Sequence, residues 1–364
     1  MLSLACLFTA CSHTEPFSNP PGNDTPFDPG PPARLTLNPA NDGHPSWLAD
    51  GSGILYSAQQ LNREDDDLCL AELPPTGGSQ RRLICDIPGE KTTTDAAQSP
   101  AAALDGRIAV LSAGNGSLHG TNPVFLGIAV TPTLDASDLQ TVRSLPFTPG
   151  GGVLQDYAGY LRWLTPERLV YVGQQFKLFR PCPEPGCPLD TLISGTEVTL
   201  LDLSGESAAG TAVPGTAQAT GVAPIQDGAA ILFTLANDTR IYRRTLASGD
   251  VSVFHDFGPA GIVRDVHAAG NRVAAVVGGR TAFSVDPRVG PTQWDSGGVL
   301  HVLDLEGNGE VVLDTPERLY RRPAVSPDGI KVVAEGFALI VTGQTSVADT
   351  TVSKSGDLYL FGGE

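Results

Sequence analysis

A short motif recurs along the chain: a proline, four residues, an Asp-Gly pair and then an apolar segment. It is complete at residues 45–51, 100–106 and 323–329, and its first and last copies read HPSWLADGSGILYS and RPAVSPDGIKVVAE. Glycine readily adopts a positive φ, so Asp-Gly between apolar segments favours a tight hairpin turn of type I′. Proline suits the start of a strand, where no amide donor is needed. The motif therefore predicts the same β-hairpin near both ends of the chain.

Degenerate copies of the motif fill the interval between these hairpins, with turns at Pro166, Asp227 and Gly270. Each turn precedes an apolar strand and then two further strand-like segments. One unit therefore holds four strands, and it recurs roughly every 40–60 residues, as in a repeat architecture. A repeat of four antiparallel strands is typical of a propeller blade. The six turns of the chain predict six blades.

The last repeat is one strand short, because the sequence given stops after DLYLFGGE at residues 357–364. A spare strand-like segment, ARLTLNPA at residues 33–40, precedes the first repeat. If this segment completes the sixth blade, the ring closes and no sheet edge stays open. We therefore predict an all-β protein: a six-bladed β-propeller of four-stranded antiparallel blades, with the ring closed by an N-terminal strand.

The composition supports this fold class and narrows the choice of partner. The sequence holds 42 glycines and 30 prolines but a single methionine, which is typical of a turn-rich β protein. Its 40 acidic and 23 basic residues give a formal net charge of −17. Nucleic acid is excluded as a partner, because a phosphate backbone needs a basic surface.

The first residues, MLSLACLFTAC, resemble a bacterial lipoprotein signal in which Cys11 would carry the lipid. The alternative is a plain secretory signal with an incidental cysteine. Residues 12–33 are rich in Pro, Gly, Ser and Asn, which predicts a flexible tether, and residues 34–364 form the propeller domain. We expect a protein of the bacterial cell envelope, in the periplasm or at the outer-membrane or cell surface, that meets a membrane only through its lipid anchor.

Four cysteines lie beyond this signal. Cys69 and Cys85 flank a predicted turn at residues 76–78, so folding of that hairpin places them opposite each other. Cys182 and Cys187 close the short loop CPEPGC. We predict that both pairs form disulfides in an oxidising compartment. Zinc is disfavoured, because this loop lacks the two-residue spacing of a zinc-binding pair and no second ligand pair is present.

The segments RLTLNPANDGHPSWLADGSGILYS and PAVSPDGIKVVAE resemble the repeats of TolB-like six-bladed propellers, a family of WD-repeat-like β-propellers. The resemblance runs from Arg34 to the C-terminus and is weakest in blades three to five. It implies a scaffolding role in complexes of the periplasm, whereas related propellers cap peptidases or process sugars. The resemblance thus implies a fold and a compartment more than a reaction.

Polar residues gather where the predicted first strands begin, at one mouth of a central channel. They are Asp42, His44, Asp95, Asp156, Tyr157, Arg264, Asp265, His267, Tyr320, Arg321 and Arg322. Clustered polar groups at a concave mouth are the default binding site of such a fold. The ligand-binding candidates are His44, Asp95, Tyr157, Asp265, His267 and Arg321. Two alternatives stay open: a metal held by His44, Asp265 and His267, and polar caps that only join the blades.

The sequence assigns no catalytic residue, no metal and no cofactor, because it has no Gly-x-Ser-x-Gly nucleophile elbow and no phosphate-binding loop. The favoured function is non-catalytic binding or scaffolding in the envelope, with an envelope protein or peptide, or a small ligand, as the partner. One alternative is an enzyme acting on polysaccharide, a lyase or hydrolase, at the channel mouth. Another is a structural surface protein without a small ligand. Insertions at residues 112–124 and 173–196 offer a second binding surface.

Overall fold

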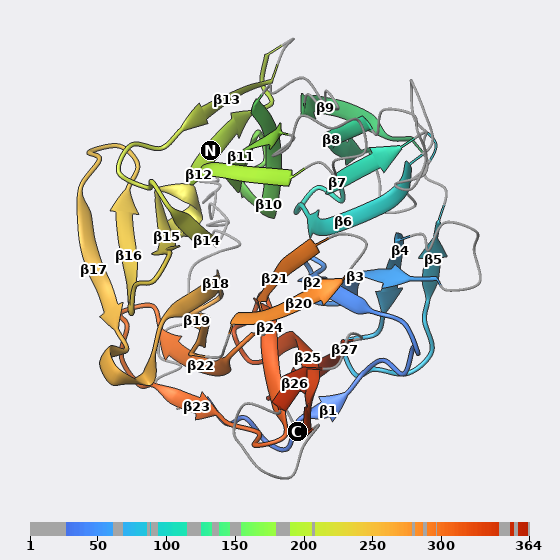
Figure 1. Ribbon diagram of the computed structural model, residues 1–364, viewed down its shortest axis with the longest axis vertical. Coiled ribbons are helices and arrows are strands. Elements are labelled where there is room, and N and C mark those ends of the chain that lie inside the picture. Colours follow the sequence, from blue (N-terminus) through green and yellow to red (C-terminus); the bar gives the residue numbers. More distant parts are fainter. Residues whose placement is uncertain are drawn as a thin grey trace, which may run out of the picture.

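The computed structural model describes residues 27–60, 68–85, 88, 94–114, 125–132, 138–145, 154–179, 190–205, 208–278, 281–286, 290–295, 297–341, 350–352 and 356–362. Strands dominate these residues, and the helical segments among them are two single turns, η1 (Gln226–Gly228) and η2 (Gly258–Ala260). The chain passes once round a ring of six four-stranded blades, which confirms the predicted propeller (Figure 1).

The first three blades follow one another in chain order, each an antiparallel sheet with its first strand innermost. Blade one comprises β2 (Asp42–Trp47), β3 (Ile54–Gln59), β4 (Leu68–Leu73) and β5 (Arg82–Ile84). Blade two comprises β6 (Thr94–Ala102), β7 (Ile108–Gly114), β8 (Phe125–Thr131) and β9 (Gln140–Leu145). Blade three comprises β10 (Leu154–Thr165), β11 (Arg168–Phe179), β12 (Asp190–Asp202) and β13 (Ala209–Ala212).

The remaining blades complete the circle. Blade four comprises β14 (Ala219–Ile225), β15 (Ala230–Leu235), β16 (Arg240–Thr245) and β17 (Val251–Asp256). Blade five comprises β18 (Val263–Ala269), β19 (Arg272–Val277), β22 (Val299–Asp304) and β23 (Val311–Leu313). Blade six comprises β24 (Arg318–Val325), β25 (Val332–Val341), β27 (Asp357–Phe361) and the N-terminal strand β1 (Ala33–Arg34).

The ring is closed by the N-terminal strand, as predicted. Strand β1 pairs antiparallel with β27, with Arg34 opposite Tyr359. The Leu35 amide continues the ladder by donating to the Leu358 carbonyl at 2.7 Å. An ion pair of 2.7 Å between Arg34 and Asp357 flanks the same junction. Strands from the two ends of the chain thus share one sheet, which leaves no open edge at the closure.

The three complete copies of the motif form the same turn. In each, the glycine N–H donates to the carbonyl three residues earlier, at 2.9 to 3.1 Å, in the pairs Gly51–Leu48, Gly106–Ala103 and Gly329–Ser326. The glycines have φ of 72°, 89° and 73°, whereas the preceding aspartates do not have a positive φ. The turn is therefore type I followed by a left-handed glycine, and the expected type I′ is wrong, because that turn needs positive φ at both central residues.

Two regions differ from the expected loops. The insertion at residues 173–196 continues the sheet of blade three: β11 and β12 stay paired as far as Phe179 and Asp190. Cys182 and Cys187, the expected second disulfide, lie outside the described residues.

A separate hairpin of β20 (Thr281–Asp286) and β21 (Gly290–Asp295) follows β19, and Figure 1 draws it across the middle of the ring. A short strand, β26 (Thr350–Val352), pairs with β25.

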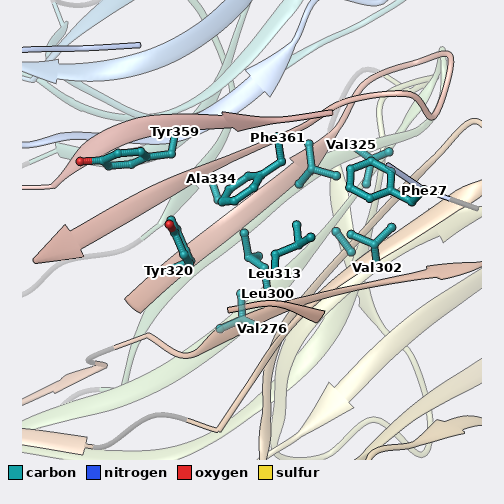
Figure 2. Close-up of a cluster of buried hydrophobic side chains, with 12 residues drawn as sticks. Phe27, Val276, Leu300, Val302, Leu313, Tyr320, Val325, Ala334, Tyr359 and Phe361 are labelled. Carbon is teal, nitrogen blue, oxygen red and sulfur yellow. The ribbon is translucent and has the colours of Figure 1, made fainter. Parts of the chain in front are cut away.

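Apolar side chains fill the six seams between neighbouring blades, with one buried cluster in each. Figure 2 shows the seam between blades five and six, where Leu300 and Val302 face Tyr320 and Phe361. The Tyr320 and Phe361 rings meet edge to face at 5.2 Å between centroids, the geometry that aromatic pairs prefer. Burial of apolar surface between blades is therefore the main force that holds the ring together.

Phe27 also belongs to this seam, although it falls within the expected tether at residues 12–33. It is buried in the same cluster as Phe361, near Val325 and Val302 in Figure 2, and the Pro29 carbonyl accepts a hydrogen bond of 2.7 Å from the Gly362 amide. A buried aromatic ring and a backbone bond are what anchor a terminal segment to a domain. The last residues of the expected tether are thus bound to the sixth blade.

Two tryptophans repeat one contact at different seams. The Trp47 indole N–H of blade one donates to the Ala324 carbonyl of blade six at 2.9 Å, and the Trp163 indole of blade three donates to the Ala101 carbonyl of blade two at 2.8 Å. Ala101 and Ala324 occupy the same place in their repeats, one residue after the motif proline. Each indole therefore packs its apolar ring in the seam and donates a hydrogen bond to a carbonyl of the neighbouring blade.

The predicted disulfide between Cys69 and Cys85 is confirmed, with Cα atoms 4.2 Å apart. It ties β4 to the end of β5 at the outer edge of blade one. The expected lipidation site, Cys11, lies outside the described residues. Among the residues that the structure describes, no helix is long and apolar enough to span a membrane.

Candidate functional site

All six innermost strands carry an irregularity of register near the ring centre (Figure 1). The pairing shifts between Gly43 and Ser46, Gln98 and Ala101, Gly159 and Arg162, Ala219 and Gly221, Val263 and Asp265, and Arg321 and Ala324. A β-bulge breaks the alternation of a strand and points an extra side chain in a new direction. Six such bulges face one another around the axis.

Four of these bulges hold a residue other than glycine in the left-handed conformation: His44, Ser99, Tyr160 and Arg322, with φ of 53°, 47°, 56° and 49°. In three of them proline follows, which is the first residue of the sequence motif. The left-handed conformation costs such a residue about 1–2 kcal/mol. Backbone strain of this kind concentrates at functional sites, so its repetition at equivalent positions marks the ring centre as the candidate site.

The bulges of blades one and two are joined side chain to side chain. His44 Nδ1 lies 2.9 Å from Ser99 Oγ, within hydrogen-bond distance, and Ser99 is buried. Burial lowers the pKa of His44 well below its usual 6.5, and the charges of Arg322, Arg321 and Arg162 lower it further. The His44 imidazole is therefore neutral at neutral pH, and arginines from blades three and six surround it.

Glu335 on β25 holds two of these arginines in place. Its carboxylate accepts from Arg322 at 2.6 Å and from Arg321 at 3.3 Å, and its side chain is 0% exposed. Arg321 also covers the Phe337 ring at 3.8 Å. Gly43 leaves room for the carboxylate, because a Cβ atom there would lie 2.7 Å from Glu335 Oε1. The sequence thus fixes two guanidinium groups with one shared counterion.

Arg162 reaches the centre from blade three. Its Nη1 donates to the Leu161 carbonyl at 2.8 Å, while its buried Nε has no hydrogen-bond partner among the described residues. Burial lowers the pKa of Arg162, and the charge of Asp265 opposes that shift. The Arg162 charge also lowers the pKa of His267 on blade five, together with burial of that ring. The charge of Arg162, on blade three, therefore acts on histidines of blades one and five.

Two of the expected site residues act within the ring wall. His267 Nδ1 accepts a hydrogen bond of 3.1 Å from the Val325 amide, which joins blades five and six. Asp265 is 2% exposed, and its Oδ1 accepts from the Val266 amide at 2.7 Å. Gly221 of blade four lies beside it, since a Cβ atom there would be 3.1 Å from that same oxygen. These contacts fit the structural alternative for His267, which caps a neighbouring strand.

The structure brings His44, Asp265 and Arg321 to the ring centre, and places His267 on the adjoining seam. Asp95 and Tyr157 lie on β6 and β10, but their side chains are outside the described part of the chain. No group of three His, Cys, Asp or Glu residues able to hold a metal occurs among the described residues. His44, Asp265 and His267 therefore do not form such a group in the structure.

We call the residues that converge here the central cluster: His44, Ser99, Arg162, Asp265, Arg321, Arg322 and Glu335. Ser99, Arg162 and Glu335 were not expected there. Tyr320, which the sequence places at the mouth, is instead fully buried in the seam of Figure 2, where its hydroxyl lies 2.7 Å from Thr315 Oγ1. The signal that could have found Ser99 is its position before the motif proline, as for His44 and Arg322.

No protein-family model and no curated protein matches this chain. Solved structures do resemble it. Regucalcin from Agrobacterium tumefaciens, a calcium-binding protein, matches with a TM-score of 0.51 and 13% identity over 93% of this chain and 94% of its own. A gluconolactonase from Xanthomonas campestris matches with a TM-score of 0.50 and 12% identity over 92% and 91%.

TolB from Acinetobacter baumannii matches with a TM-score of 0.48 and 15% identity over 86% of this chain and 64% of its own. At such identities a structural likeness establishes the fold alone. The expected resemblance is therefore confirmed as far as the six-bladed propeller, a fold that the chain shares with the calcium-binding and lactonase structures.

Proposed function

We propose that the protein is a non-catalytic binding protein of the bacterial cell envelope, whose ligand approaches along the ring axis and contacts the central cluster. The observation that supports this is that the charges of Arg321 and Arg162, from blades six and three, both act on the His44 ring of blade one and lower its pKa, where the innermost strands carry their bulges. Such convergent polar groups on a rigid scaffold are what ligand recognition requires. The side chains of Arg321 and Arg322 are 18% and 27% exposed, so solvent reaches them.

The chemistry of the cluster favours recognition over catalysis. Guanidinium groups donate hydrogen bonds and carry charge, but they do not act as nucleophiles or bases near neutral pH. The pKa of His44 lies well below 6.5, which makes it a weak base. Of the two carboxylates, Glu335 is engaged by two arginines and Asp265 by a backbone amide. The groups present can bind and orient a ligand.

The envelope location rests on the N-terminal sequence and on one structural feature. The MLSLACLFTAC segment provides the expected lipidation site at Cys11, and residues 12–26 would link it to the ring. The disulfide between Cys69 and Cys85 suits an oxidising compartment. We infer a partner of the envelope, either a protein, a peptide or a small ligand, with the lipid as the contact to the membrane.

One observation favours a second function, a lyase acting on uronic-acid polysaccharide. A neutral imidazole beside several guanidinium groups could take the proton from the carbon next to the sugar carboxylate, while the arginines stabilise the resulting enolate. A carbon–carbon double bond would then form as the glycosidic oxygen leaves with the electron pair of its broken bond. The low pKa of His44 counts against this function, because it weakens the base.

Native mass spectrometry of the protein extracted from its own envelope in mild detergent tests the proposal. We expect a stoichiometric ligand or partner that is lost from a His44→Ala, Arg321→Gln double variant. Extracted protein that carries nothing, together with release of unsaturated product from polyuronate, seen as new ultraviolet absorbance, would reject the binding function and establish the lyase. Protein that carries nothing and releases no product would reject both.

A further inference from the structure

The central cluster is basic, although the chain as a whole is acidic. The formal net charge is −17, with 23 basic against 40 acidic residues. Around His44, however, three arginines face two carboxylates, those of Glu335 and Asp265. Arg264 on β18 is engaged elsewhere, because its Nε donates to the Gly278 carbonyl at the end of β19. These five groups taken together therefore carry one positive charge in excess.

Arg162 differs from the other two arginines in its partners. Its charge is opposed by that of Asp265, whereas Arg321 and Arg322 share the carboxylate of Glu335, at 3.3 and 2.6 Å. Arg162 donates from Nη1 to a carbonyl, and its buried Nε lacks a partner among the residues that the structure describes. A buried donor without a partner costs about 1–3 kcal/mol, and more when it is charged. An unsatisfied buried donor of this kind calls for an explanation, and an acceptor from outside the chain is one such explanation.

The neighbours of Arg162 select the kind of acceptor. Arginine carries donors and no acceptor, and it stays charged inside proteins. Its planar fork matches the two oxygens of a carboxylate. A single excess charge balances a carboxylate, which is a monoanion, better than a phosphate near −2. The His44 ring, on which the charge of Arg162 acts, pairs with the Ser99 hydroxyl at 2.9 Å, and both groups can bond polar atoms of a ligand.

We propose that Arg162 binds a carboxylate of the ligand at the ring centre, with His44 and Ser99 contacting the neighbouring hydroxyl groups, as in a uronic acid. This inference rests on the proposed function, because it takes the central cluster to be the ligand site. It adds the chemical class of the ligand: a sugar acid or another hydroxy acid, with the acid group innermost. A ligand of this class fits both candidate functions, as the bound ligand of a binding protein and as the substrate of a lyase.

Calorimetric titration of the full-length chain with four probes tests this inference: sodium galacturonate, galactose, sodium acetate and inorganic phosphate. We expect galacturonate to bind most tightly, acetate more weakly, and galactose, which lacks the carboxylate, at least about tenfold more weakly than galacturonate. Arg162→Gln should reduce galacturonate affinity by about tenfold or more. Arg168→Gln is the matched control, because its exposed ion pair with Asp202 lies on the outer part of the blade-three hairpin.

Folding of the variant is measured separately. Arg162→Gln leaves the buried Asp265 without the positive charge that opposes it, so we expect the denaturation midpoint without ligand to be lower than that of the wild type. Galacturonate should raise the midpoint of the wild type and not of the variant. If Arg162→Gln does not fold, Arg162→Lys keeps the charge without the fork and should still weaken galacturonate binding.

Four outcomes would overturn the inference. They are equal affinity for galactose and galacturonate, tighter binding of phosphate, unchanged affinity in Arg162→Gln, and no binding of any carboxylate probe. None of them removes the proposed function by itself. An uncharged ligand found by native mass spectrometry would reject the carboxylate and keep the binding protein, whereas extracted protein without any ligand or partner would reject the binding protein.

Discussion

The blade seams and the ring centre use the same strands in opposite ways. On β24, Tyr320 lies in the seam towards blade five and Ala324 in the seam towards blade one, and both are 0% exposed. Between them, Arg321 and Arg322 both reach Glu335 across the bulge. The seams consist of apolar groups with satisfied hydrogen bonds. The centre combines left-handed backbone with buried charge, so stability and recognition are separated within one strand.

This difference gives an order of expected effects. A change in a seam removes packed apolar surface and should lower the free energy of unfolding without a selective effect on ligands. A change at the centre should alter binding with a small effect on stability. The predictions below test that separation, beginning with the largest loss.

Tyr320→Ala should destabilise the protein by about 3–5 kcal/mol, because it empties a fully buried aromatic position between blades five and six. Urea denaturation followed by tryptophan fluorescence measures the change. Tyr320→Phe is the control: it keeps the ring, removes the hydroxyl that lies 2.7 Å from Thr315 Oγ1, and should cost about 1 kcal/mol. Similar losses in the two variants would show that packing in this seam is not the dominant contribution.

The position of Tyr320 shows what limited the sequence analysis. The sequence places Tyr320 at the channel mouth, because it stands next to Arg321 and Arg322 where a first strand begins. The shift between Arg321 and Ala324 moves the later residues to the opposite face. The hydrophobic pattern of each strand was enough to predict six blades and the closing strand. It contains no signal for the bulge, which inverts the alternation.

The same limit explains which members of the central cluster were found. His44 directly precedes the motif proline and Arg321 stands two residues before it, both in complete copies of the repeat, so their strands could be placed. Arg162 lies in a degenerate copy, and Glu335 lies on a second strand, whose charged residues are expected to face solvent. Residues from distant blades meet only through the closed ring. Their convergence follows from tertiary geometry, which local spacing does not contain.

Asp42 should make stability depend on pH on the weakly acid side. It begins β2, and burial raises its pKa from 3.8 to about 6, despite hydrogen bonds from Asn38 and Thr36. Because the folded pKa exceeds the unfolded one, the proton stabilises the fold below about pH 4, and this is lost as the pH rises towards 6. A pKa shift of this size corresponds to a change of up to about 3 kcal/mol in the free energy of unfolding.

Urea denaturation of the wild type and of Asp42→Asn, in steps of about one pH unit from about pH 4 to about pH 7, measures this dependence. The variant should gain stability relative to the wild type as the pH rises, since asparagine does not ionise. Asp50→Asn is the control, because Asp50 is an exposed turn aspartate whose pKa is lowered by its hydrogen bonds to Ser52. Relative to the wild type, this variant should lose stability as the pH rises, which is the opposite sign. A constant difference between the wild type and Asp42→Asn would contradict the prediction.

Trp47→Phe should cost about 1–2 kcal/mol, because it leaves the Ala324 carbonyl without its indole donor at the seam of blades one and six. Trp163→Phe removes the equivalent bond to Ala101. Trp47 is buried whereas Trp163 is half-buried, so the loss should be larger at position 47. Urea denaturation curves of the two variants compare the losses in the free energy of unfolding. A larger loss for Trp163→Phe would contradict the role of burial.

The smallest expected effect isolates backbone strain at the ring centre. Ser99 has φ of 47°, a region in which glycine is not penalised and alanine is. Ser99→Ala and Ser99→Gly both remove the hydroxyl that pairs with His44, so their difference reports the backbone alone. We expect the glycine variant to be more stable than the alanine variant by about 0.5–1 kcal/mol.

The sign of that difference should reverse two residues further along the same strand. Ala101 is buried in the seam with blade three, and it is not among the residues with positive φ. Ala101→Gly should therefore destabilise by about 0.5–1 kcal/mol, as in an ordinary strand. Glycine that stabilises at position 99 and destabilises at position 101 would locate the strain at the bulge. Since Ser99 contacts His44 and Ala101 does not, only the position 99 variants should also weaken galacturonate binding.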